Sequence, residues 1–208
     1  MQSAAVVLAG GASRRMGQDK LTLAWNGQGG KTILDHVLET AASVTTEIAV
    51  VVSPARPDVG PFAPGQVMIR DKALYRGPLA ALAHAWPRLE WDGCEAVHVL
   101  AGDLPGLHPE VLRACAQVLA DAGADVDGVA VVRDGRLQPL LACYRPRIGE
   151  LFMHQVTVGE TRILAALAAA TLVKLDGGRA GWPRWWTQPV HTPAEYDAWR
   201  REVAAWQS

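Results

Sequence analysis

The chain is poor in cysteine, in excess charge of one sign and in long hydrophobic segments. Its three cysteines, at positions 94, 115 and 143, lie far apart and form no CxxC, so neither a disulfide framework nor a thiolate zinc site is indicated. Lys and Arg number 20 against 21 Asp and Glu, and the two signs are interspersed. A broad basic face for nucleic acid or for an anionic membrane is therefore not expected.

The apolar run near the N-terminus begins at Ala4 and ends at Gly10, and no basic region precedes it. A run of this length is too short to cross a bilayer, and it lacks the layout of a signal peptide. We therefore expect no membrane partner and a location in the reducing cytoplasm. The length of 208 residues suits one domain.

Several common catalytic patterns are missing as well. The six histidines form no HExxH and no serine lies in GxSxG, so zinc and serine hydrolases lack support. The GxGxxG fingerprint is absent, and the second expected strand ends near Ser53 without an acidic residue, which argues against a nicotinamide-dependent oxidoreductase. A Walker loop is excluded because five residues separate Gly11 from Gly17, and Gln18 follows.

The most informative segment that is present covers residues 8–20, LAGGASRRMGQDK, directly after an apolar run. Gly10 and Gly11 carry no Cβ, so their backbone N–H groups can approach phosphate oxygens closely. The segment also adds three cations, which are Arg14, Arg15 and Lys20. A strand that leads into such a loop predicts a polyphosphate site, most simply for a nucleoside triphosphate.

Short β-branched runs alternate with helical patterns along the chain. Strands are expected at residues 4–9, 48–53, 67–70, 97–101 and 129–133, and helices at 32–43, 78–86 and 109–122. This alternation predicts an α/β fold, a three-layer α/β/α sandwich with a mostly parallel central sheet.

A last helix is expected after Thr192, which can cap it, with Pro193 in the first turn and Glu195 reaching back to the cap. Four apolar side chains then fall on one face at helical spacing and are expected to face the core: Tyr196, Trp199, Val203 and Trp206.

Two aspartates follow expected strands and are candidate site residues. Asp103 comes after the strand at 97–101, and we expect it to hold Mg²⁺, a hard cation that prefers carboxylate and phosphate oxygens. The alternative is an aspartate that only forms the turn before Pro105. Asp71 follows the strand at 67–70, and its carboxylate suits either the N–H donors of guanine or ribose hydroxyls.

Residues 8–20 resemble the signature of the MobA-like nucleotidyltransferases, LAGGxSxRMGxDK. Every fixed position is matched, by Leu8, Ala9, Gly10, Gly11, Ser13, Arg15, Met16, Gly17, Asp19 and Lys20. The stretch around Asp103 resembles the metal-binding GDxP segment of that family, and Asp71 with the later Gly77-Pro78-Leu79 resembles its nucleotide-contacting segment.

The resemblance implies the Rossmann-like nucleotidyltransferase fold and, within the family, transfer of GMP from GTP to molybdopterin with Mg²⁺. It implies one domain over residues 1–208, with a nucleotide-binding half of about 1–105 and an acceptor-binding half of about 106–208. The implied nucleotide-binding residues are Leu8, Ala9, Gly10, Gly11, Arg15, Lys20, Asp71 and Asp103. We expect Arg15, Lys20 and Asp103 to carry the catalysis, with Asp103 as the metal ligand.

Weaker resemblances concern the acceptor. Arg136 and Arg162 resemble basic positions of later family segments, and each is either an acceptor-phosphate ligand or a solvated cation. The segment from Gly135 to Tyr144 resembles a strand that returns beside the acceptor site. Three tryptophans could stack on a pterin ring, although ordinary packing is favoured, and they are Trp182, Trp185 and Trp186.

One departure from the family pattern leaves the substrates open. Before Thr192 the guanylyltransferases carry an asparagine-rich stretch, whereas this chain has Gln188, Pro189, Val190 and His191. His191 could act as a ligand or hydrogen-bond partner, but imidazole is a poorer Mg²⁺ ligand than an amide oxygen. A relative that uses CTP or another phosphorylated acceptor is one alternative, although Gly10 favours guanine because cytidylyltransferase relatives tend to have LAAG. Another is a non-catalytic nucleotide-binding protein that hands cofactor to a molybdoenzyme. The protein partners to consider for the chain are a molybdoenzyme or other cofactor-biosynthesis proteins.

Overall fold

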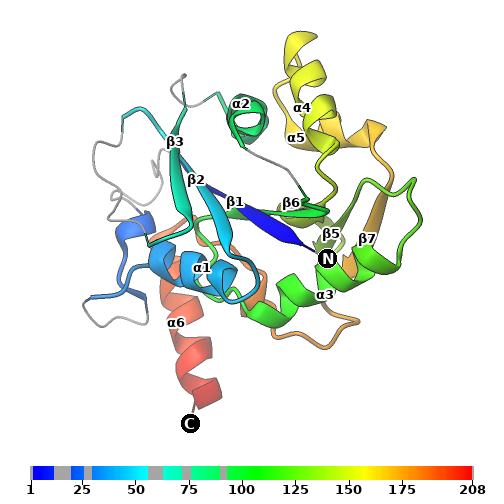
Figure 1. Ribbon diagram of the computed structural model, residues 1–208. Helices are drawn as coiled ribbons and strands as arrows, with labels where there is room; N and C mark the ends of the chain where they lie inside the picture. The colour runs from blue at the N-terminus through cyan, green and yellow to red at the C-terminus, as the bar shows by residue number, and fades with distance from the viewer. Residues whose placement is uncertain are drawn as a thin grey trace.

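The computed structural model describes residues 2–11, 20–25, 30–55, 63–71, 76–89 and 93–207, and only the backbone of Lys20, Trp206 and Gln207. Seven strands of this part of the chain form one sheet in the order β3-β2-β1-β4-β6-β5-β7 (Figure 1). They are β1 (Ser3–Ala9), β2 (Glu47–Val52), β3 (Gln66–Arg70), β4 (Ala96–Ala101), β5 (Gly128–Arg133), β6 (Arg136–Tyr144) and β7 (Leu172–Asp176). Only β6 runs antiparallel to its neighbours.

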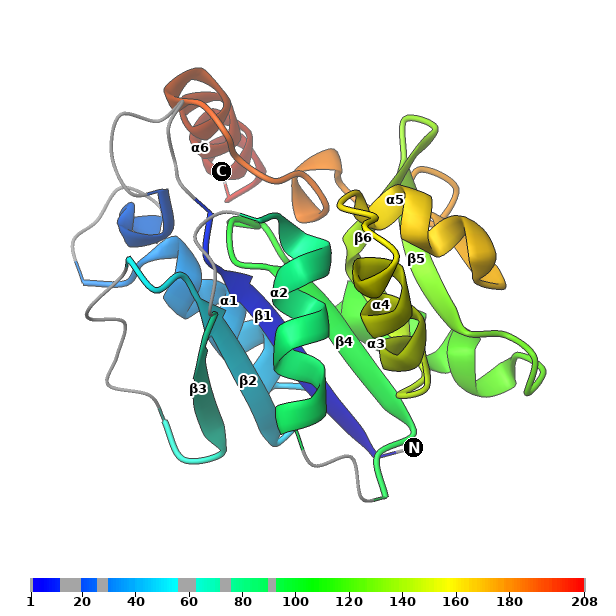
Figure 2. The same cartoon turned by 90° about the horizontal axis from the view of Figure 1, so that it is seen from above.

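Helices cover both faces of the sheet, so the predicted three-layer α/β/α sandwich is confirmed. On one face lie α1 (Ile33–Ala42) and α3 (Pro109–Asp121), and on the other lie α2 (Pro78–Ala85), α4 (Ile148–Thr157) and α5 (Ile163–Ala166) (Figure 2). Short 3₁₀ turns are η1 (Lys20–Thr22), η3 (Trp86–Arg88), η4 (Leu167–Ala169) and η5 (Arg184–Trp186). None of the described helices is both long and apolar enough to span a membrane.

The five strands predicted from β-branched runs are all present, within one residue at each end. The returning strand implied for residues 135–144 is present as β6. The central strands are buried on both faces, as their nearly continuous apolar sequence requires, and their side chains divide between two separate hydrophobic clusters. Because β1 to β4 are parallel, their carboxyl ends meet at one edge of the sheet.

The last helix, α6 (Pro193–Gln207), begins as predicted. Thr192 N donates to Glu195 Oε2 at 3.0 Å, and Glu195 N donates to Thr192 Oγ1 at 3.2 Å, which completes a capping box. Trp199 and Val203 are buried against Ile33, with Tyr196 beside them. The side chain of Trp206 lies outside the described residues.

The tryptophan-rich segment before α6 packs against α3. Trp186 stacks on His108 with ring centroids 3.8 Å apart, and Trp182 Nε1 donates to Glu110 Oε1 at 3.3 Å. Trp182 and Trp186 are buried in the same cluster as α1 and α3, and Trp185 packs against that cluster. Packing, the favoured alternative for these side chains, is therefore what the structure has.

Two buried histidines predict that the protein loses stability in acid. Burial lowers the pKa of His36, in α1, from 6.5 to about 4, and it does the same for His98, in β4. Both side chains are therefore neutral in the folded protein near pH 7. Below pH 6.5 the unfolded chain binds more protons at these two positions than the folded protein does. The free energy of unfolding is therefore highest above pH 6.5 and decreases as the pH falls toward 4. By pH 4, each histidine is expected to lower the free energy of unfolding by about 3 kcal/mol relative to pH 7.

Replacement of His98 by leucine tests this. His98 Nδ1 is buried without a hydrogen-bond partner, so His98→Leu removes a titrating group and leaves no donor stranded. Urea unfolding at pH 7, 5.5 and 4 should show the variant losing about 3 kcal/mol less than the wild type over this range. Carboxylates titrate in both proteins and cancel in the comparison. An identical pH slope for the two proteins would contradict the prediction.

Candidate functional site

A cavity of about 940 Å³ opens where the parallel strands end. Its walls come from the carboxyl ends of β1 to β4, the N-terminus of α2, the β5–β6 hairpin and the segment before α6. This position is the crevice in which open α/β sheets bind ligands, and the volume is that of a site for a molecule of nucleotide size or larger. The cavity brings together five of the predicted nucleotide-binding residues, namely Leu8, Gly10, Gly11, Asp71 and Asp103.

Two glycines allow the strand ends to lie close together. A Cβ on Gly10 would lie 3.3 Å from Ser53 N, at the end of β2. A Cβ on Gly102 would lie 3.1 Å from Leu8 O, and Gly102 N donates to that same oxygen at 3.0 Å. Gly10 lines the cavity, whereas Gly102 does not.

The other positions of the signature either lie off the cavity wall or are not fully described. Ala9 is buried in the core and its side chain does not line the cavity. Lys20 begins η1, but its side chain is not described, and Arg14 and Arg15 lie outside the described residues, as do the remaining positions of the signature from 13 to 19.

The backbone of Asp103 is held at the cavity by a hydrogen bond from the segment before α6. Its side chain is 8% exposed, and its carbonyl accepts a hydrogen bond from Val190 N at 3.0 Å. Asp103 Oδ2 lies 3.4 Å from His191 Nδ1, so the segment before α6 contacts the carboxylate directly. Asp71 is half-buried, and its backbone N donates to Val52 O at 2.9 Å, which extends the β2–β3 ladder into the cavity. Asp103 and Asp71 thus both line the cavity, at the ends of β4 and β3, which are separated in the sheet by β1 and β2.

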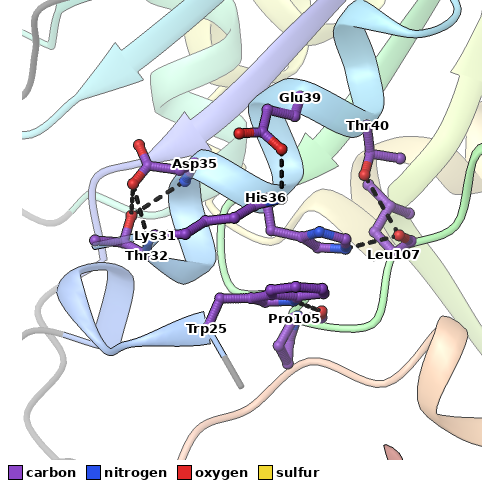
Figure 3. Close-up of polar contacts among 9 residues, drawn as sticks. All are labelled: Trp25, Lys31, Thr32, Asp35, His36, Glu39, Thr40, Pro105 and Leu107. Atoms are coloured by element: carbon purple, nitrogen blue, oxygen red, sulfur yellow. Dashed lines mark hydrogen bonds and ion pairs between the residues drawn. The ribbon is translucent and has the colours of Figure 1, made fainter. Parts of the chain in front are cut away.

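The loop after Asp103 is fixed by α1 and Trp25 (Figure 3). Trp25 Nε1 donates to Pro105 O at 2.7 Å, and His36 Nε2 lies 2.9 Å from Leu107 O, where only the nitrogen can donate. The Trp25 and His36 rings stack with centroids 4.6 Å apart. Because burial lowers the pKa of His36 to about 4, this histidine is a neutral donor at pH 7, and it positions the loop without adding charge.

Four arginines line the cavity, and they are Arg76, Arg133, Arg136 and Arg184. Arg133 donates to Thr187 Oγ1 at 3.1 Å and to Trp182 O at 3.0 Å, and Arg184 lies 2.9 Å from a carboxylate oxygen of Asp134. Arg76 and Arg136 are exposed.

Some predicted acceptor residues are absent from the cavity wall. Arg162 is 81% exposed, pairs with Glu160 at 3.6 Å and does not line the cavity. None of the three tryptophans at 182, 185 and 186 lines it either. Of the positions missed from sequence, Arg76 had a usable signal, since it directly precedes the Gly77-Pro78 start of α2. Arg133 and Arg184 had none, because their place depends on pairing between distant segments.

The chemistry of the lining fits a hard cation. Asp103 offers a nearly buried carboxylate, and the cavity has room for phosphate oxygens and water to complete the coordination. Within the described ranges, no group of three or more His, Cys, Asp and Glu side chains gathers to form a complete metal cage. The site therefore suits a metal ion that arrives with a phosphorylated ligand.

The sequence was compared with known families and proteins. The model of the MobA-like NTP transferase domain matches residues 5–172. A relative from Mycobacterium avium (strain 104), named probable molybdenum cofactor guanylyltransferase, is 32% identical over 171 residues, which are 82% of this chain and 83% of the relative.

Solved structures show the same fold. Molybdopterin-guanine dinucleotide biosynthesis protein A from Archaeoglobus fulgidus has a TM-score of 0.73 at 21% identity, covering 97% of this chain and 99% of that chain. CMP:2-keto-3-deoxy-manno-octonic acid synthetase complexed with CTP has a TM-score of 0.70 at 16% identity, covering 99% of each chain. At these identities the likeness concerns the fold alone.

The packing around Gly102 predicts a difference between two glycine-to-alanine variants. Neither Gly10 nor Gly102 has a positive φ, so alanine is allowed at both positions by the backbone. In Gly102→Ala the new Cβ meets Leu8 O at 3.1 Å and two leucine methyl groups at 3.3 Å, whereas in Gly10→Ala its tightest contact is a single atom at 3.3 Å. Gly102→Ala should therefore lower the free energy of unfolding by about 1–3 kcal/mol.

Gly10→Ala is the matched control and should lower the free energy of unfolding by less than Gly102→Ala does. Urea unfolding midpoints of both variants at pH 7 measure the difference. Equal midpoints, or a stabilised Gly102→Ala protein, would show that the strand ends have room for a side chain at residue 102.

Proposed function

The chain belongs to the MobA-like NTP transferase family, and on that premise we propose that it transfers GMP from GTP to molybdenum-molybdopterin. The products are molybdopterin guanine dinucleotide and pyrophosphate. The observation that carries the proposal is the cavity lined by Gly10, Gly11, Asp71 and Asp103 at the ends of the parallel strands β1, β3 and β4. The name of the Mycobacterium avium relative supports the choice of guanylyl transfer.

In this proposal the nucleotide binds to the half of the chain up to about residue 105. Backbone groups of residues 8–11 approach the phosphates, and Arg15 and Lys20 offset their charge. Asp71 contacts the base or the ribose. The acceptor binds to the half from about residue 106, against the β5–β6 hairpin and the segment before α6.

Asp103 is the residue that would hold a divalent cation, with Mg²⁺ as the expected ion. When bound, the ion neutralises charge on phosphate oxygens. The chain's own contribution is a carboxylate on a loop whose backbone carbonyls accept hydrogen bonds from Val190 on one side and from Trp25 and His36 on the other. In phosphoryl transfer, positioning of this kind is a main contribution of the protein to catalysis.

The reaction itself is a displacement at the α-phosphorus of GTP. An oxygen of the terminal phosphate of molybdopterin forms the new bond to phosphorus, the bond to the β-phosphate oxygen breaks, and pyrophosphate leaves with that electron pair. The attacking phosphate is already ionised, so no general base is required. Arg15 and Lys20 would stabilise the charge that develops on the leaving group.

A second candidate is transfer of a nucleotide from CTP or to another phosphorylated acceptor. The observation that favours it is the departure at residues 188–191, since Gln188, Pro189 and His191 all line the cavity. The likeness in fold to a synthetase complexed with CTP is compatible with it. Under either candidate we propose a cytoplasmic enzyme, and under the first its product passes to a molybdoenzyme or to other cofactor-biosynthesis proteins.

Turnover of two variants tests the catalytic assignment. Purified protein with molybdopterin, Mg²⁺ and each NTP in turn should release pyrophosphate fastest with GTP. Lys20→Ala and Asp103→Asn should each lower kcat by about 100-fold, because each removes charge stabilisation that develops with the leaving group. Asp121→Asn, which changes an exposed carboxylate in α3 away from the cavity, is the control and should be unaffected. Near wild-type turnover in both site variants would refute the assignment, and a preference for CTP would select the second candidate.

A second pair of variants tests the acceptor wall. Arg136 is exposed and lines the cavity, whereas Arg162 is exposed and does not. Arg136→Ala should raise KM for molybdopterin by about tenfold and leave KM for GTP unchanged, because a lost charge-assisted contact to phosphate costs about 1.5 kcal/mol. Arg162→Ala should change neither constant. Equal effects of the two substitutions would show that Arg136 contributes only to the general charge of the surface.

A further inference from the structure

His191 is fixed in place by backbone contacts on both sides. The preceding residue, Val190, donates its N–H to Asp103 O at 3.0 Å. The N–H groups of His191 and Thr192 both donate to Glu195 Oε2, at 2.7 and 3.0 Å. The imidazole therefore stands on a rigid backbone at the start of α6, beside the Asp103 carboxylate.

The distance between the two side chains suits joint ligation better than a direct hydrogen bond. His191 Nδ1 and Asp103 Oδ2 are 3.4 Å apart, which is longer than the usual range of about 2.7–3.2 Å for an N–H···O bond. Two donor atoms that each lie about 2.1 Å from one divalent ion are separated by about 3.0–3.4 Å, depending on the coordination angle. The observed separation falls within that range.

Exposure of the two side chains points to the same arrangement. The Asp103 side chain is 8% exposed and the His191 side chain 43% exposed, and both line the cavity. A bound ion would therefore contact the buried carboxylate and the imidazole on the protein side and keep an open side for phosphate oxygens. The nearby carboxylate of Glu195 already accepts two backbone N–H groups, so it is less suited to this role.

We propose that His191 is a metal ligand together with Asp103, which makes the centre a mixed nitrogen and oxygen site. This inference rests on the proposed function, in which Asp103 holds the ion. Mg²⁺ prefers oxygen ligands, whereas first-row transition ions bind sites of mixed nitrogen and oxygen donors more tightly. His191 thus shifts the preference of the centre from Mg²⁺ toward Mn²⁺, relative to a centre that has oxygen ligands alone.

Mn²⁺ with pyrophosphate is the probe, because pyrophosphate contains no nitrogen. Pulsed electron paramagnetic resonance of Mn²⁺ bound to the full chain should show ¹⁴N modulation from a directly bound imidazole. In His191→Asn that modulation should disappear, and the ratio of Mn²⁺ to Mg²⁺ affinity should fall by about tenfold. His154→Asn removes an exposed histidine of α4 that does not line the cavity, and it should change neither result.

Asp103→Asn distinguishes the role of His191 as a ligand from the assignment of the metal ion to Asp103. If it weakens Mn²⁺ binding while the wild type shows no ¹⁴N modulation, Asp103 holds the ion and the role of His191 is refuted alone. If it binds Mn²⁺ as the wild type does, the metal assignment in the proposed function is refuted as well. The wild-type spectrum decides the role of His191 even if His191→Asn does not fold, and modulation that persists in a folded His191→Asn also refutes it.

Discussion

The site depends on the close approach of β1 and β4 at their carboxyl ends. β1 lies between β2 and β4, so the direction in which strands are added reverses there and a crevice opens beyond the strand ends. The hydrogen bond from Gly102 N to Leu8 O carries the pairing one residue past β4. Because Gly102 has no Cβ, this contact forms without crowding by a side chain, and Asp103 follows directly at the cavity that Gly10 and Gly11 also line.

The loop that contains Asp103 is then supported by two distant parts of the chain. Trp25 and His36 donate to its carbonyl groups from the α1 side (Figure 3), and Val190 donates to the carbonyl of Asp103 itself. Buried carbonyl groups that lack such donors cost free energy, so these bonds stabilise one loop conformation over others. A carboxylate held in this way is preorganised, and its position does not have to be established when the ligand binds.

Local sequence signals account for much of this architecture. Strands β1, β2 and β4 are apolar runs buried on both faces, whereas β3 is partly exposed, and each of the four strands is followed by a glycine, a serine or an aspartate that marks the edge. Strand β6 is different, because it contains Pro139 and its pairing with β5 shifts register between Ala130 and Val131. Only the family resemblance pointed to it. The role of Arg133 could not be predicted either, since its acceptor on Trp182 lies 49 residues away in the sequence.

The same long-range contacts decide which cations remain for a polyphosphate. Arg133 is engaged with carbonyl oxygens of residues 182–183, and Arg184 pairs with Asp134, so much of the positive charge on the far wall already has partners. Gly11 lines the cavity, and Arg14 follows it by three residues, a span of at most about 11 Å. The glycine loop therefore offers charge that its own sequence brings near the strand ends. We accordingly expect the polyphosphate at that end of the cavity and the acceptor against the opposite wall, with the Asp103 carboxylate between them.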